Sequence, residues 1–289
     1  MFENILFPVD FSKRSQAAAR QVAAYASQFH SRVTLLHLVE TPDFLFGMPE
    51  YSVVSFSQIR DEQMAERRKK FETWLHAELD GVPIRRVIAE GDPGREIVRY
   101  AHENEVSLIM MPSHGFGPFR RFMIGSTKAK VLHDAHVPIW TDAHAEESAE
   151  HPRSSQLKSV LCAIDLGPQS EAALQVASGI AAQTGGDVQV VHAIPTIEVR
   201  PASYFDADFS AHLSAEARLR AEELQDKTGT NFKVCVQGGD PSEVVSRLAT
   251  ARQADLVVIA RGAILGGLGR LRTHAYSIIN KSPAPVLSV

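Results

Sequence analysis

The chain repeats its own order of motifs about halfway along, and this repetition constrains its fold more than any other feature. The run SVLCAID at Ser159–Asp165 follows the similar run NILFPVD at Asn4–Asp10 by 155 residues. Gly239-Asp240-Pro241 follows Gly91-Asp92-Pro93 by 148 residues. Motifs that return in the same order at nearly constant spacing predict two copies of one structural unit.

A polar stretch separates the two copies. The sequence from 142 to 157, DAHAEESAEHPRSSQL, is acidic and contains serines, which is a linker composition. A length of 289 residues also suits about two domains. We therefore expect domains at residues 1–142 and 157–289, with a linker at 143–156.

Each copy alternates apolar runs with segments that carry apolar residues at helical spacing. In the first copy the runs expected to form strands are 4–9, 33–39, 85–89, 108–111 and 137–141. Strands that alternate with helices predict a parallel, doubly wound sheet. The fold class is thus α/β, with two tandem open parallel sheets of five strands each, Rossmann-like, and helices on both faces.

A glycine-bearing loop in the first copy has the composition of an anion site. The apolar run Leu108–Met111 leads into it, and Gly125-Ser126-Thr127 opens the helical pattern that follows. Glycines let the backbone approach an anion closely, and free N–H groups at a helix start point toward it. Ser126 either donates its hydroxyl to such an anion or caps the helix.

The spacing in this loop resembles the nucleotide loop of the universal stress protein family. That family's pattern includes a glycine, nine residues and then Gly-Ser, which Gly115 and Gly125-Ser126 match. The stretch Ser113-His114-Gly115 also resembles it. The resemblance extends to ILFPVDFS, LLHLVE and EGDP in the first half, and to VLCAIDLG, VVHAIP, GGDP, ADLVVIARG and APVLSV in the second. One departure is Pro112, where the family pattern begins with glycine, because proline has no N–H to donate.

The resemblance implies that ATP binds at the carboxyl ends of the strands, where open α/β sheets place their ligands. The phosphate-binding residues that it implies are Gly115, Gly125, Ser126 and Thr127, with Ser113 and His114 beside them. His114 is either a phosphate donor or an ordinary loop residue. Mg²⁺ is compatible with a bound triphosphate, although no carboxylate cluster requires a metal and no metal ligand is predicted.

Two further residues match the family's adenosine contacts. Asp10, which closes the first strand, would lie beside adenine and ribose, or it is simply the N-cap of the next helix. Leu38, which follows the histidine of the second strand, would line the adenine pocket, or it is an ordinary apolar residue at a strand end.

The second copy departs from this pattern. Ala193 stands where the first copy has Leu38, and Arg272-Thr273 stands where it has Gly125-Ser126. A long side chain at this glycine position would crowd the phosphates, so we expect weak ATP binding or none there. Arg272, with Arg270, could instead bind a simpler anion.

Composition excludes several classes of partner. The net charge is −4 and the sequence pI is about 6.3, which gives no general attraction to nucleic acid or to anionic membranes. No apolar run reaches the length of a membrane span, and the start lacks the basic region of a signal peptide. We expect a cytoplasmic protein in which Cys162 and Cys235 stay reduced.

Three functions fit these observations. The first is an ATP-binding stress sensor or signalling module with an unknown protein partner. The second is an enzyme, a slow ATPase or adenylyl transferase, although we find no convincing catalytic base. The third is a scaffold that binds no ATP, which Pro112 would favour. Family members dimerise through their last strands, so we expect 137–141 to pair with 285–289 inside the chain, with a further homodimer possible.

Overall fold

The structure is a computed structural model, and it describes residues 1–39, 62, 64–112, 126–142, 156–194, 204–261 and 273–289. Ser113, His114, Gly115 and Gly125 therefore lie outside the described residues. In the first half the chain order is β1 (Asn4–Val9), α1 (Lys13–Phe29), β2 (Arg32–Val39), β3 (Ile84–Glu90), α3 (Pro93–Glu103), β4 (Leu108–Pro112), α4 (Ser126–Asp134) and β5 (Ile139–Asp142).

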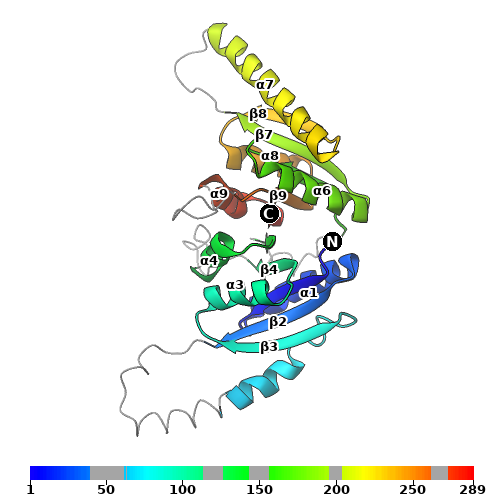
Figure 1. The fold of residues 1–289 in the computed structure, drawn as a ribbon, viewed down its shortest axis with the longest axis vertical. Helices are drawn as coiled ribbons and strands as arrows, with labels where there is room; N and C mark the ends of the chain where they lie inside the picture. The colour runs from blue at the N-terminus through cyan, green and yellow to red at the C-terminus, as the bar shows by residue number, and fades with distance from the viewer. Residues whose placement is uncertain (40–61, 63, 113–125, 143–155, 195–203, 262–272) are drawn as a thin grey trace, which may run out of the picture.

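The second half repeats this order. Its elements are β6 (Ser159–Ala163), α6 (Ser170–Thr184), β7 (Asp187–Ile194), α7 (Tyr204–Thr228), β8 (Lys233–Gly238), α8 (Pro241–Ala251), β9 (Leu256–Ile259), α9 (Thr273–Lys281) and β10 (Val286–Ser288). The repetition seen in the sequence is thus present in the structure, with the helical residues 64–73 at the place that α7 takes in the second half (Figure 1).

The two halves share one ten-stranded sheet with the order β3-β2-β1-β4-β5-β10-β9-β6-β7-β8. Within each half the strands are parallel, five to a half, as the sequence predicts. Strands β5 and β10 join the halves as an antiparallel pair, with Trp140 opposite Leu287. The expected pairing of 137–141 with 285–289 is confirmed, and it turns two open sheets into one.

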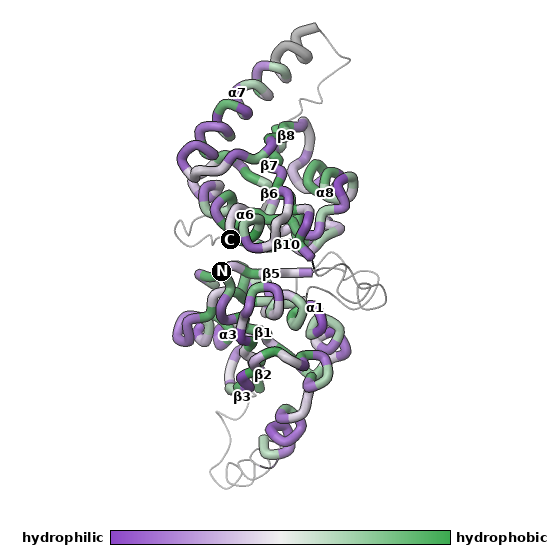
Figure 2. Tube along the Cα trace, turned by 90° about the vertical axis from the view of Figure 1, so that its right-hand side faces the viewer, coloured by the Kyte–Doolittle hydropathy of each residue, from purple (hydrophilic) through white to green (hydrophobic). Residues whose placement is uncertain are grey.

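Helices cover both faces of this sheet, and each face has its own apolar core that extends through both halves. Helices α1, α6 and α7 pack on one face, while α3, α4, α8 and α9 pack on the other. Neighbouring strand residues alternate between the two cores, with Ile5 and Phe7 in the first and Leu6 in the second. Because both faces are buried, inner strands such as β1 (NILFPV) are largely apolar, whereas the outer strand β3 (IRRVIAE) also carries charged residues. Hydrophobic residues are green in Figure 2.

The turn after the third strand of each half has the same geometry. Asp92 caps α3 by accepting a hydrogen bond from the N–H of Arg95 at 2.8 Å. Gly91 precedes it with φ of +136°, and Gly239 has φ of +137° in the second half. A side chain is strained at such a φ, so glycine is required at both turns.

Arg261 ties the second half to the first. It is buried at the end of β9, with 3% of its surface exposed. Its guanidinium donates to the carbonyl oxygens of Leu132 at 3.2 Å, Ala135 at 3.0 Å and Val137 at 2.7 Å. These carbonyls lie at the end of α4 and just beyond it, where backbone oxygens lack helical partners and a positive charge is favoured.

Cys162 and Cys235 form no disulfide, as the sequence predicts. Burial raises the pKa of the Cys162 thiol to about 12, which makes it an unreactive core residue. None of the helices in the described ranges combines the length and apolar character needed to cross a membrane.

Candidate functional site

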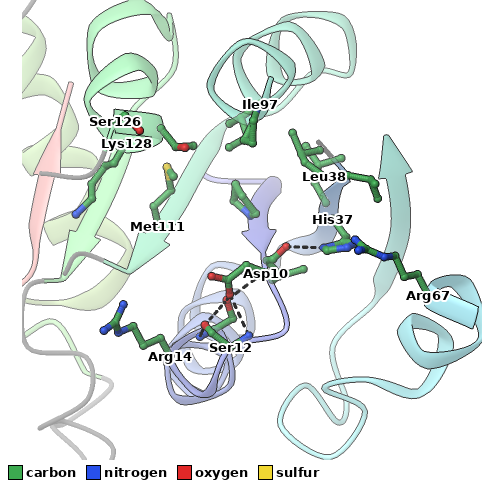
Figure 3. Close-up of a pocket in the computed structure, with 17 residues that line it drawn as sticks. Asp10, Ser12, Arg14, His37, Leu38, Arg67, Ile97, Met111, Ser126 and Lys128 are labelled. Carbon is green, nitrogen blue, oxygen red and sulfur yellow. Dashed lines mark hydrogen bonds between the residues drawn. The ribbon is translucent and has the colours of Figure 1, made fainter. Parts of the chain in front are cut away.

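A pocket of about 630 Å³ lies at the carboxyl ends of the first-half strands. Figure 3 shows it between the turn after β1, the end of β2 and the start of α4. Four predicted site residues line it, namely Asp10, Leu38, Ser126 and Thr127. Its size falls in the range of small-molecule sites.

Asp10 is fixed in the pocket wall by the turn that follows it. Its Oδ1 accepts hydrogen bonds from the Ser15 hydroxyl at 2.7 Å and from the Ser12 N–H at 3.1 Å. Burial alone would raise the pKa of Asp10, but these hydrogen bonds outweigh it, so the pKa lies below its ordinary value and the group is anionic. The N-cap of α1 is Ser12, so the alternative interpretation of Asp10 as the cap is wrong.

The same turn contains a strained residue. Phe11 has φ of +58°, a conformation that bulky side chains rarely adopt. Its ring packs on His37 with centroids 4.4 Å apart and on Trp74 at 4.9 Å. This aromatic packing holds the turn in the strained conformation, which sets the position of the Asp10 carboxylate.

His37 supports the turn from β2 and was not singled out in the sequence. Its Nδ1 lies 3.0 Å from the carbonyl oxygen of Val9, which can only accept, so Nδ1 carries a proton. Burial lowers the pKa of His37, so the ring is neutral and Nε2 is an acceptor. This Nε2 is buried and has no hydrogen-bond partner in the part of the chain that the structure describes.

The pocket combines an apolar floor with a polar end. Leu38, Ile97 and Met111 line the floor from three different elements. Ser126 and Thr127 line the polar end, where α4 begins. The structure describes α4 from Ser126 onward, and whether Ser126 acts as a donor to a ligand stays a prediction.

Three basic residues also line the pocket, and sequence reasoning did not single them out as ligand contacts. Arg14 comes from α1, Arg67 from the helical residues 64–73, and Lys128 from the first turn of α4. Figure 3 shows Lys128 and Arg14 on the left side of the pocket and Arg67 on the right. With Asp10 as the one carboxylate among the described lining residues, the wall has a net positive charge.

Comparison with known proteins identifies the fold and the family. The model of the universal stress protein family matches residues 1–141 and 156–289. The chain belongs to the universal stress protein family. It is also similar to two universal stress proteins of Methanocaldococcus jannaschii. One is 31% identical over 140 residues, which are 48% of this chain and 81% of that protein. The other is 28% identical, over 48% of this chain and 93% of its own length.

Among solved structures, the whole architecture resembles a universal stress protein from Archaeoglobus fulgidus. The TM-score is 0.73 at 20% sequence identity, and the match covers 99% of this chain and 97% of the other. At this identity the likeness supports the tandem fold and nothing about a ligand.

The second universal stress protein unit has a pocket of about 560 Å³ at the matching place. Its turn is built alike, because Ser170 donates to Asp165 Oδ1 at 3.1 Å and Leu166 has φ of +58°. His192 again lies 2.9 Å from the carbonyl oxygen of the preceding strand's end, at Ile164. The lining differs, since the described residues around this pocket include two carboxylates and neither lysine nor arginine.

The described residues give the two pockets different chemistry. The first has a buried acceptor, His37 Nε2, an apolar floor, and cationic and hydroxyl groups at one end. Among the described residues no three His, Cys, Asp or Glu side chains gather as metal ligands would.

Proposed function

We propose that the first-half pocket binds ATP and that the protein is a nucleotide-dependent sensor or signalling module of the stress response. The observation that carries this proposal is the arrangement in one cavity of an apolar floor and a cationic, hydroxyl-bearing end. Adenine requires apolar contact, and a triphosphate requires positive charge and hydrogen-bond donors. The Gly115-to-Gly125 loop, which lies outside the described residues, would supply backbone donors to the phosphates.

The second pocket is proposed to bind ATP weakly or not at all. Asp165 and Asp240 line it, and its described lining contains neither lysine nor arginine, so a triphosphate would meet two carboxylates there. Two domains, 1–142 and 157–289, would then share one working site and one altered site. A protein partner or a second copy of the chain would read the nucleotide state.

The experiment is equilibrium binding of ATP with Mg²⁺, with stoichiometry counted per chain. The blocking variant is Leu38→Trp, because an indole at this position would occupy the floor of the pocket. The matched control is Ala193→Trp, at the equivalent position of the second pocket. We expect one ATP per wild-type chain, at least a tenfold loss of affinity for Leu38→Trp, about 1.4 kcal/mol, and no change for the control.

The outcomes separate the functions that the sequence left open. No ATP bound by the wild type would overturn the proposal and favour a scaffold. Two ATP per chain would show that the second pocket also works. Gly125→Arg, which copies Arg272 of the second half, should abolish binding if the loop holds the phosphates.

A further inference from the structure

We propose that Lys128 and Arg14 together form a subsite that binds the distal phosphates of the nucleotide. This inference rests on the proposed function. It names the side chains that would hold the phosphates at one end of the same pocket. It names two side chains that the glycine-loop pattern does not contain.

Lys128 is buried in an unusual way for a lysine. Only 5% of its surface is exposed, although it lies in the first turn of α4 beside the pocket. Within the described part of the chain it makes no hydrogen bond and no ion pair. Lysine is almost never fully buried without a partner, because the charged amine loses its hydration.

Arg14 lies on the same side of the pocket. The two side chains reach this side from different elements, α1 and α4, as Figure 3 shows. Burial and, to a smaller extent, the positive charge of Arg14 together lower the pKa of Lys128 to about 7. Two cationic groups that disfavour each other's charge are stabilised when an anion lies between them.

The start of α4 adds to this preference for an anion. The first N–H groups of a nine-residue helix have no helical partner, and the helix dipole is positive at this end. Ser126 and Thr127 bring their hydroxyl groups to the same end of the pocket. Lys128, Arg14 and the helix start therefore favour one ligand chemistry, a phosphate chain.

The fold does not need a lysine at this position. The second half has Ala275 in its place, and Gln169 in place of Arg14, and the surrounding elements are unchanged. The other charged or titratable groups that line the pocket are Asp10, His37 and Arg67. Asp10 is held by Ser12 and Ser15, so it is not the missing partner of Lys128.

The test measures affinity for adenosine, AMP, ADP and ATP in the wild type and in two variants. Lys128→Met keeps the length of the side chain and removes the charge, and Arg14→Gln copies the second half. The control is Lys130→Met on the same helix, whose amine pairs with Asp134 at 3.3 Å outside the pocket. We expect each test variant to lose at least tenfold in ATP affinity, to keep its affinity for adenosine within twofold, and the control to match the wild type.

A second measurement uses the fraction of Lys128 amines that is neutral in the empty protein, because these amines take up a proton when an anion binds. Calorimetric titrations at pH 7 in two buffers of different ionisation enthalpy report the protons taken up on binding. Since a pKa of about 7 leaves about half of the Lys128 amines neutral, the wild type should take up about half a proton more than Lys128→Met. A merely structural lysine would produce no such difference.

Three results would overturn the inference. One is an unchanged ATP affinity in Lys128→Met, and another is an equal loss of ATP and adenosine affinity, which would indicate a distorted pocket. The third is a wild type that binds neither ATP nor adenosine, which would overturn the proposed function as well. Thermal unfolding of each variant confirms that it is folded before binding is measured.

Discussion

The two halves of the molecule share a framework and differ in the side chains that face their pockets. Phe11 and Leu166 have the same φ of +58°, and Asp10 and Asp165 each accept a hydrogen bond from the serine five residues later. The cationic wall of the first pocket has no counterpart among the described residues of the second. The turn can therefore be explained by the fold alone, whereas the positive charge around the first pocket is the feature that the proposed nucleotide site requires.

This difference separates two kinds of residue that look alike in one copy. A feature present in both halves, such as the histidine bound to the end of the preceding strand, can be explained by stability alone. A feature that costs stability and occurs in one half, such as Lys128, calls for a functional reason. The next three predictions test this division.

The largest expected effect is on the contact between the halves. Arg261→Met keeps the buried stem but leaves three carbonyl oxygens without the guanidinium that they accept from. We expect the free energy of unfolding to fall by roughly 3 kcal/mol, since hydrogen bonds to a buried charge are involved. Urea-induced unfolding measures this, with the exposed Arg247→Met as the control, expected within about 0.5 kcal/mol of the wild type. Equal urea midpoints for Arg261→Met and Arg247→Met would refute the role of Arg261 in holding the two halves together.

Lys128→Met is expected to stabilise the protein while it weakens ATP binding. Removing a buried, unpartnered amine should raise the free energy of unfolding at pH 7 by about 2 kcal/mol. The folded-state pKa of about 7 lies below the ordinary lysine value of 10.5, so the unfolded state binds more protons between these pH values. Wild-type stability should therefore rise with pH in this window, and that of the variant should rise less.

Unfolding at pH 7 and pH 9.5 checks this, with Lys130→Met as the control. Because Lys130 forms only a surface ion pair, the free energy of unfolding of Lys130→Met should differ from that of the wild type by less than about 1 kcal/mol at both pH values. A variant that is less stable than the wild type at pH 7 would mean that Lys128 has a stabilising role in the empty protein.

The smallest effects are expected at the two histidines, and they should be equal. His37→Phe and His192→Phe each remove one hydrogen bond to a strand-end carbonyl, at a cost of about 1 kcal/mol. The pKa of His37 is lowered by burial, so its contribution is complete above about pH 6.5 and is lost as the pH falls below that value. Acid unfolding of His37→Phe should thus be shallower than that of the wild type. A large loss in the free energy of unfolding for only one of the two variants would show that the two turns are not equivalent.

Much of the fold could be predicted because local patterns and the repeat agree. Each apolar run became a strand, and the Asp92 cap formed where Asp-Pro placed it. The role of Asp10 could be predicted only in part, since Asp10 and Ser12 are both residues that can cap a helix and only the geometry shows that Ser12 caps α1.

The burial of Lys128 and the hydrogen bonds of Arg261 could not be predicted from local sequence. Lys128 and Lys130 stand two positions apart in a short helix, and only the packing of that helix shows that the first is buried and the second forms a surface ion pair. Arg261 finds its acceptors more than a hundred residues earlier in the chain. Such partners are set by the register of the two halves across β5 and β10.

The antiparallel junction of β5 and β10 has a consequence for communication between the pockets. It places helix α4 of the first half against the second half. The first turn of α4 lines the first pocket, and the carbonyl oxygens at its end and just beyond it hold Arg261. Arg261 follows directly on Ala260, which lines the second pocket. A shift of this one helix would therefore act on both pockets through contacts within the protein.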